Sequence, residues 1–91
     1  MSGSYFVLFG ETSATHSDRI GITATRKLGP AVTRNRIKRI VREIFRRSVP
    51  SGAPPLDVVV NVRGSALGVS FERLTDDLVS RFVELRRRIR T

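Results

Sequence analysis

The sequence predicts a small α+β domain, an α/β sandwich in which helices cover one face of a short mixed sheet. Three short runs rich in β-branched and aromatic residues predict strands, and two longer segments with a helical repeat of apolar residues predict amphipathic helices. Proline and glycine separate these segments. The order is therefore β-β-α-β-α, and the 91 residues suffice for a single domain, residues 1–91.

The first two predicted strands lie close together in the sequence. Residues 4–9 (Ser-Tyr-Phe-Val-Leu-Phe) combine aromatic and β-branched side chains, as strands do. A polar, turn-rich segment, residues 10–18, follows them. Residues 19–25 then alternate apolar and small side chains, which predicts a second strand. Because a turn-rich segment joins the two strands, we expect them to form a hairpin.

The segment from Ala31 to Ser48 predicts the first helix, which follows Pro30, a residue well tolerated at a helix start. Its apolar residues recur at helical spacing and form one stripe. These residues are Ile37, Ile40, Val41, Ile44 and Phe45. On the opposite side, spacings of four, three and four residues align a second set, which we name the polar ridge. The polar ridge consists of Asn35, Arg39, Arg42 and Arg46, and it is flanked by Arg36, Lys38 and Arg47.

The last strand and the last helix follow a proline-rich linker. Residues 57–63 (Asp-Val-Val-Val-Asn-Val-Arg) predict the third strand, and the run of valines predicts burial on both faces. The helix begins after Ser70, a suitable N-cap. Its predicted core stripe is Phe71, Leu74, Leu78, Phe82, Leu85 and Ile89. Cations near its C-terminal end favour the helix dipole, and we expect them to be solvated. They are Arg86, Arg87, Arg88 and Arg90.

Positive charge is concentrated around the first helix. Nine of the seventeen Lys and Arg residues and one acid, Glu43, lie between Arg26 and Arg47, so this segment carries +8 of the net charge of +9. A charged helix face is most often simply solvated. Here, however, like charges at helical spacing repel one another with little relief, and each such pair costs a few tenths of a kcal/mol. The pattern therefore favours contact with a polyanion, above all a nucleic acid.

No arrangement of side chains predicts a catalytic or metal site in the polypeptide. His16 is the only histidine and lies in a polar loop without an orienting partner, so we expect it to be solvated. Asp76 and Asp77 are adjacent and point about 100° apart on a helix, which suits capping better than metal binding. Asp57 lacks the converging carboxylates that a metal-dependent nuclease needs. The sequence therefore predicts no catalytic residue and no metal ligand.

The first strand offers a second surface. Alternation places Tyr5, Val7 and Phe9 on one face and Phe6 and Leu8 on the other. If helices cover only one face of the sheet, one of these sets stays open as a platform on which unpaired bases could stack. Core packing is the simpler expectation for each residue taken singly.

Composition also bears on the compartment. The sequence has no cysteine, which excludes disulfides and thiolate metal sites and suits a reducing cytoplasm. The first nine residues carry no basic segment, and their apolar run is short, so we expect no signal peptide. No stretch approaches the ~20 apolar residues of a membrane span. We expect a cytoplasmic protein without a membrane partner.

The segment from Arg19 to Arg46 closely resembles the protein subunit of bacterial ribonuclease P. The pattern Lys-x-Gly-x-Ala-Val-x-Arg-Asn-Arg-x-Lys-Arg-x-x-Arg is long and specific. The third strand and the last helix also fall where that family has them, so the resemblance spans essentially the whole chain. It implies a fold like that of ribosomal protein S5 domain 2, with a left-handed β-α-β crossover that departs from the usual rule.

The resemblance also implies a function. In this family the RNA subunit performs the hydrolysis with bound Mg²⁺ and removes the 5′ leader of precursor tRNA, while the protein binds that RNA and the leader as a monomer in a one-protein, one-RNA complex. The chain would thus be part of a ribonucleoprotein endonuclease. The residues expected to contact RNA are Arg26, Lys27, Arg34, Asn35, Arg36, Lys38, Arg39, Arg42 and Arg46. Those expected to line the leader cleft are Tyr5, Val7 and Phe9.

One departure from the family pattern concerns the N-terminus. Family members normally begin with a basic tail and a helix whose aromatic residues form the other wall of the leader cleft, and this sequence begins at its first strand. We therefore expect the family's N-terminal helix to be missing from this sequence: either the sequence is truncated, or the cleft of this member has one wall. Two other functions stay open at this stage: a general binder of structured RNA, such as a ribosomal or assembly protein, and a self-sufficient nuclease.

Overall fold

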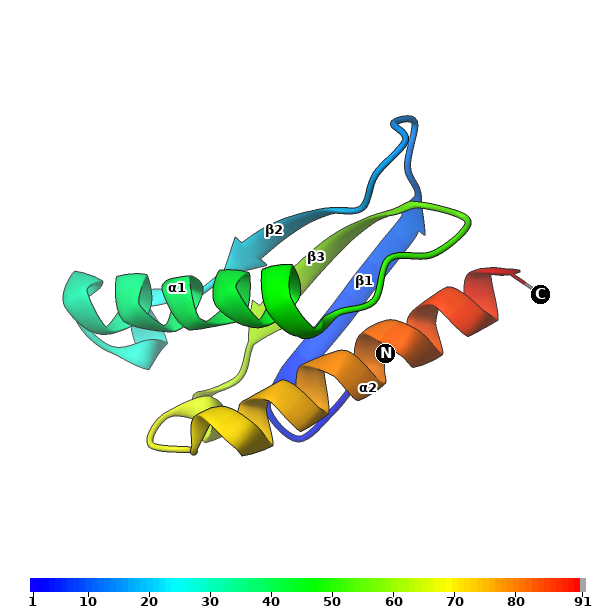
Figure 1. Ribbon diagram of the computed structural model, residues 1–91. Coiled ribbons are helices and arrows are strands. Elements are labelled where there is room, and N and C mark those ends of the chain that lie inside the picture. Colours follow the sequence, from blue (N-terminus) through cyan, green and yellow to red (C-terminus); the bar gives the residue numbers. More distant parts are fainter. Residues whose placement is uncertain (91) are drawn as a thin grey trace.

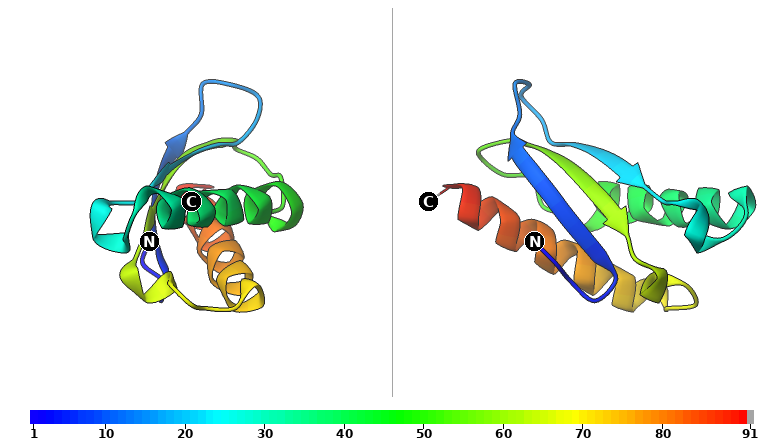
Figure 2. Two further views of the ribbon diagram at one scale, coloured as in Figure 1. Left: turned by 90° about the vertical axis from the view of Figure 1, so that its left-hand side faces the viewer. Right: turned by 180° about the vertical axis from the view of Figure 1, so that it is seen from behind.

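The computed structural model describes residues 1–90, except for the side chain of Arg90, and contains a three-stranded mixed sheet with two helices on one face (Figure 1, Figure 2). The strands are β1 (Phe6–Thr12), β2 (Arg19–Thr23) and β3 (Leu56–Val62). The helices are α1 (Ala31–Ser48) and α2 (Phe71–Arg90). Two single 3₁₀ turns, η1 (Arg26–Leu28) and η2 (Gly64–Ala66), precede them. The predicted fold class and the element order are confirmed.

The strand order in the sheet is β1-β3-β2. β3 pairs antiparallel with β1, with Phe6 opposite Val62, and parallel with β2, with Ile20 opposite Val58. The expected hairpin between the first two strands is therefore wrong, because β3 lies between them. β3 is the most apolar of the three strands, and the central place satisfies the backbone hydrogen bonds on both of its edges.

The connection from β2 through α1 to β3 is a left-handed crossover. Figure 1 views the sheet from the side of the helices, and β3 lies to the left of β2 when both strands are turned to point upward. Most connections between parallel strands have the opposite hand. Along the chain, α1 therefore connects two strands that are hydrogen-bonded to each other.

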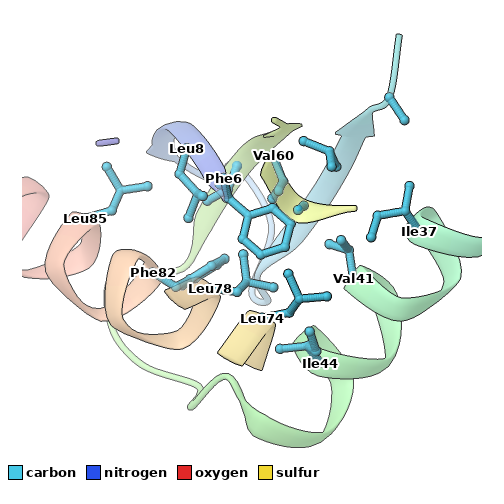
Figure 3. Packing of buried hydrophobic residues seen from close by; sticks show 14 of the residues in the cluster. Phe6, Leu8, Ile37, Val41, Ile44, Val60, Leu74, Leu78, Phe82 and Leu85 are labelled. Carbon is cyan, nitrogen blue, oxygen red and sulfur yellow. The ribbon is translucent and has the colours of Figure 1, made fainter. Parts of the chain in front are cut away.

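The core lies between the sheet and the two helices (Figure 3). Phe6 and Leu8 of β1 are fully buried there, and so is Val60 of β3. From the helices, Ile37, Val41 and Ile44 of α1 meet Leu74, Leu78 and Phe82 of α2. The rings of Phe45 and Phe82 lie 5.7 Å apart between their centroids. The apolar stripe predicted for the first helix is therefore the face that docks.

The opposite face of the sheet is open. In β3 buried and accessible residues alternate, and the side chain of Val59 is 45% exposed. The expectation that the valine run is buried on both faces is wrong, because both helices pack on the same side. Phe9 of β1 is 56% exposed on this open face.

α2 begins as predicted and ends differently. The Ser70 hydroxyl accepts a hydrogen bond from the backbone N–H of Arg73 at 3.3 Å, which confirms the cap. Phe71, which was predicted to belong to the core stripe, is 50% exposed, so that expectation is wrong. Leu74, one turn later, is the first α2 residue in the core. Neither α1 nor α2, within the described residues, has the apolar length that a membrane crossing requires.

The C-terminal arginines do not form one solvated cluster. Arg86 is buried, because its guanidinium pairs with Asp18, donates to the carbonyl of Pro50 at 2.8 Å and lies over the ring of Phe82. The expectation of solvation is wrong for this residue. Arg87 and Arg88 are exposed and pair with Glu84. The side chain of Arg90 lies outside the described part of the chain.

Candidate nucleic-acid interface

The polar ridge forms one continuous surface on α1. All four of its side chains are exposed, and they line a shallow depression of about 550 Å³ together with Lys38 and Glu43. The polar ridge faces away from the core, because Ile37, Val41 and Ile44 on the opposite side of the helix are buried. The structure thus brings together the residues that helical spacing had aligned.

Most cations of α1 are not neutralised. Glu43 is the one acid on the helix, and it pairs with Arg46 at 2.8 Å and with Arg47. The hydrogen bond from Arg46 holds the pKa of the Glu43 carboxyl below its usual value. Among the described residues, no acidic side chain pairs with Arg36, Lys38, Arg39 or Arg42. The positive charge is therefore strongest over the first two-thirds of the helix.

Three other predicted RNA-contacting residues lie at the start of this surface. Arg26 and Lys27 are exposed on η1, whose Leu28 is buried and holds the turn beside α1. Arg34 differs from the rest, because it is half buried and its Nε has no hydrogen-bond partner among the described residues. The basic surface therefore extends from η1 along α1, with Arg34 set deeper than its neighbours.

The open face of the sheet carries a second depression of about 550 Å³. Phe9 and Val59 give it an apolar floor. Gly21 leaves space beside them, because apart from Gly21 and its two chain neighbours no described residue has an atom within 4 Å of the place where a Cβ would stand. Val7 lies on β1 and Tyr5 directly precedes that strand. Both are half buried, and neither lines this depression. Of the three predicted leader-cleft residues, the structure therefore places only Phe9 in it.

An ion pair at the edge of this depression was not predicted from the sequence. The guanidinium of Arg19 donates two hydrogen bonds to the carboxylate of Asp57, from Nε at 2.9 Å and from Nη2 at 2.8 Å. This contact lowers the pKa of Asp57 and raises that of Arg19. Arg19 is the first residue of β2 and Asp57 the second of β3, and only the parallel register of these strands brings them opposite each other. No local sequence pattern signals such a pair.

The residues considered for catalysis have other roles or stand apart. Asp77 accepts hydrogen bonds from the backbone N–H groups of Ser4 and Tyr5, at 3.3 and 3.0 Å, and so fixes the start of β1. His16 is exposed in the loop before β2. No three His, Cys, Asp or Glu side chains gather in the described chain closely enough to hold a metal ion.

Comparison with known proteins agrees with this architecture. The family model for Ribonuclease P matches residues 1–90. The ribonuclease P protein component of Desulfatibacillum aliphaticivorans is 42% identical over 60 residues, which is 66% of this chain and 51% of that protein. The component from Thermotoga maritima is 40% identical over 77 residues, 81% of this chain and 62% of that protein. The chain thus spans between about half and three-fifths of the length of these relatives.

Solved structures show the same fold. The RNase P protein from Thermotoga maritima superimposes with a TM-score of 0.76 at 34% identity, covering 98% of this chain and 81% of that one. The RNase P protein from Staphylococcus aureus gives a TM-score of 0.74 at 26% identity, covering 93% and 77%. On the family match, the relatives and the shared fold together, this chain belongs to the ribonuclease P protein family.

Proposed function

We propose that this chain acts as the protein subunit of ribonuclease P, which binds the catalytic RNA and the 5′ leader of precursor tRNA and promotes removal of the leader during tRNA maturation. Family membership supports this role. The observation that carries it is the exposed row of cations on α1, because Arg39 and Arg42 of the polar ridge have no acidic partner in the described chain.

The basic surface of α1 and η1 would bind the ribonuclease P RNA. Guanidinium groups make forked hydrogen bonds to phosphate oxygens, and each phosphate neutralised releases condensed counterions. Because the apolar stripe of α1 is buried in the core, the helix presents these groups in a fixed orientation. RNA contacts would come from Arg26, Lys27, Arg34, Asn35, Arg36, Lys38, Arg39, Arg42 and Arg46.

The open face of the sheet would receive the leader. Phe9 and Val59 form an apolar floor on which an unpaired base can stack, whatever its identity. Val7, earlier on β1, and Tyr5, just before that strand, would extend this path. The Arg19–Asp57 pair and Glu11 leave the depression without excess positive charge, so affinity here would come from stacking more than from phosphate contacts.

Hydrolysis is assigned to the RNA subunit and to Mg²⁺ bound mainly by that RNA. The polypeptide would position the two RNAs as a single RNA-binding domain in a cytoplasmic complex of one protein with one RNA. Phosphates that converge near a cleavage site repel one another, and a row of cations reduces that repulsion.

Reconstitution tests the proposal. The chain is combined with a bacterial ribonuclease P RNA at low Mg²⁺, and cleavage of precursor tRNA is compared with that by the RNA alone and by the protein alone. We expect the protein to increase cleavage by the RNA and to show no cleavage by itself. Binding to the RNA without any gain in cleavage would indicate a general structured-RNA binder instead. Metal-dependent cleavage by the protein alone would indicate a nuclease.

A further inference from the structure

A groove of about 420 Å³ runs between the N-terminal half of α1 and the loop that joins η2 to α2. Figure 1 shows these two segments at the same end of the molecule. Its walls are mainly apolar, with Ile40 of α1 on one side and Leu67, Val69 and Leu74 on the other. Among the described residues, Arg36 is the one charged residue that lines it. The groove is separate from the open face of the sheet, which lies on the other side of the core.

Apolar side chains at this end of the molecule are unusually exposed. Leu67, in the wall of the groove, is 42% exposed. Phe71, one turn before Leu74, is 50% exposed, and Val32, one turn before Arg36, is 78% exposed. None of the three is among the buried residues of the hydrophobic core. Exposed apolar side chains that gather beside a groove typically mark a binding surface.

We propose that this groove holds an unpaired nucleotide of the RNA that α1 binds, with the base against Leu67 and Ile40 and the adjacent phosphate on Arg36. The inference rests on the proposed function. Two observations select this occupant. Arg36 belongs to the same helix as the polar ridge, so an RNA strand that follows the ridge passes the mouth of the groove. In addition, no acidic side chain of the described chain lines the groove, which suits a polyanion.

A binding experiment separates the two parts of this site. Affinity for a ribonuclease P RNA is measured at several salt concentrations for the unaltered chain, Leu67→Ala and Arg36→Ala. We expect Leu67→Ala to weaken binding about tenfold without changing the salt slope, because apolar contact with the base is lost and no phosphate contact is. We expect Arg36→Ala to lower the slope by about one. Leu67→Met, which keeps the apolar surface, should bind like the unaltered chain.

Matched variants make the result decisive. Val83→Ala removes a similarly exposed apolar side chain from α2, outside the groove, and should leave binding unchanged. If Leu67→Ala binds as tightly as the unaltered chain while Arg39→Ala binds more weakly, the groove proposal fails and the proposed function stands. If Arg39→Ala also binds normally, the proposed function itself fails. If Leu67→Ala instead abolishes self-association of the protein, the groove is a contact between copies and the nucleotide proposal is overturned.

A cross-link would identify the occupant directly. The sequence contains no cysteine, so Leu67→Cys carries a single thiol to which a photoreactive aryl azide can be attached. We expect irradiation of the complex to join this position to an unpaired nucleotide of the RNA, mapped by primer extension. Cross-links confined to base-paired RNA or to a second protein chain would contradict the proposal.

Discussion

Arg86, near the C-terminal end of α2, is paired with Asp18, in the loop before β2, and the two side chains are only 8% and 9% exposed. The other oxygen of Asp18 accepts a hydrogen bond from the backbone N–H of Leu56 at 2.8 Å. Arg86 also donates to the carbonyl of Pro50. The pair therefore connects three segments: the end of the β1–β2 loop, the linker before β3 and the last helix.

Replacement of Arg86 should strongly destabilise the fold. Arg86→Met leaves the Asp18 carboxylate buried without its partner, and loss of one member of a buried pair costs about 3–5 kcal/mol. The free energy of unfolding, measured by urea denaturation, checks this value. Arg87→Met, which removes an exposed arginine paired with Glu84, should cost about 1 kcal/mol or less. Adding Asp18→Asn to Arg86→Met should recover part of the loss, and no recovery would contradict the pairing.

Removal of one cation from the polar ridge should weaken RNA binding and leave the fold intact. Arg39 is exposed and has no acidic partner among the described residues, so Arg39→Ala should lower the slope of log affinity against log salt by about one. The melting temperature should not change. Arg73→Ala, an exposed arginine on α2, serves as the control and should keep the original slope. Equal effects of the two variants would mean that RNA responds only to net charge.

Glu43 should lower the affinity for RNA, because its carboxylate forms ion pairs with Arg46 and Arg47 and so reduces the positive charge of α1. Glu43→Gln removes this charge, so we expect tighter RNA binding and a salt slope steeper by about one. Filter binding over a salt series measures both quantities. Glu84→Gln removes the same charge from α2, where it pairs with Arg87 and Arg88, and should have a much smaller effect.

Phe9 should distinguish precursor from mature tRNA. Phe9→Ala removes the exposed ring of the open face, and loss of one base stack costs about 1–3 kcal/mol. Affinity of the reconstituted complex should therefore fall for precursor tRNA and stay the same for tRNA without a leader. Phe9→Tyr keeps the ring and should retain the preference. A parallel loss for both RNAs would place the leader elsewhere.

Acid should remove the stabilisation supplied by the Arg19–Asp57 pair. The pKa of Asp57 is lowered in the folded protein by the hydrogen bond from Arg19, so the pair contributes stability above the ordinary Asp pKa of about 4. That contribution is lost as the pH falls through the lowered pKa. We expect Asp57→Asn to melt at a lower temperature than the unaltered chain at pH 7, and the two melting curves to converge in strong acid. A constant difference would show that the effect is not ionic.

Local patterns predicted the parts of the molecule that depend on neighbours in the sequence. The bounds of α1 agree with those expected, because Pro30 and the apolar repeat are local signals. The polar ridge followed from the same repeat. Its cations could therefore be placed on one surface before any tertiary contact was known.

The features that sequence reasoning missed depend on distant residues. β3 enters the sheet between two strands that precede it by more than thirty residues, and no local pattern signals that. Arg86 meets a partner 68 positions away, so it could not be told from its solvated neighbours. The Arg19–Asp57 pair requires the parallel register of β2 and β3. The groove beside Leu67 likewise exists only when α1 and the loop before α2 come together.

The left-handed crossover has a consequence for the energetics of assembly. α1 is tied at both ends to strands that are hydrogen-bonded to each other, and its apolar stripe is locked in the core. The helix cannot turn or detach without exposing that stripe to water, which costs free energy. Its cations are therefore held in register before any RNA arrives, and little backbone order has to be gained on binding. A rigid array of cations favours RNA whose phosphates already match its spacing. The fold would therefore select RNA by the shape of its backbone.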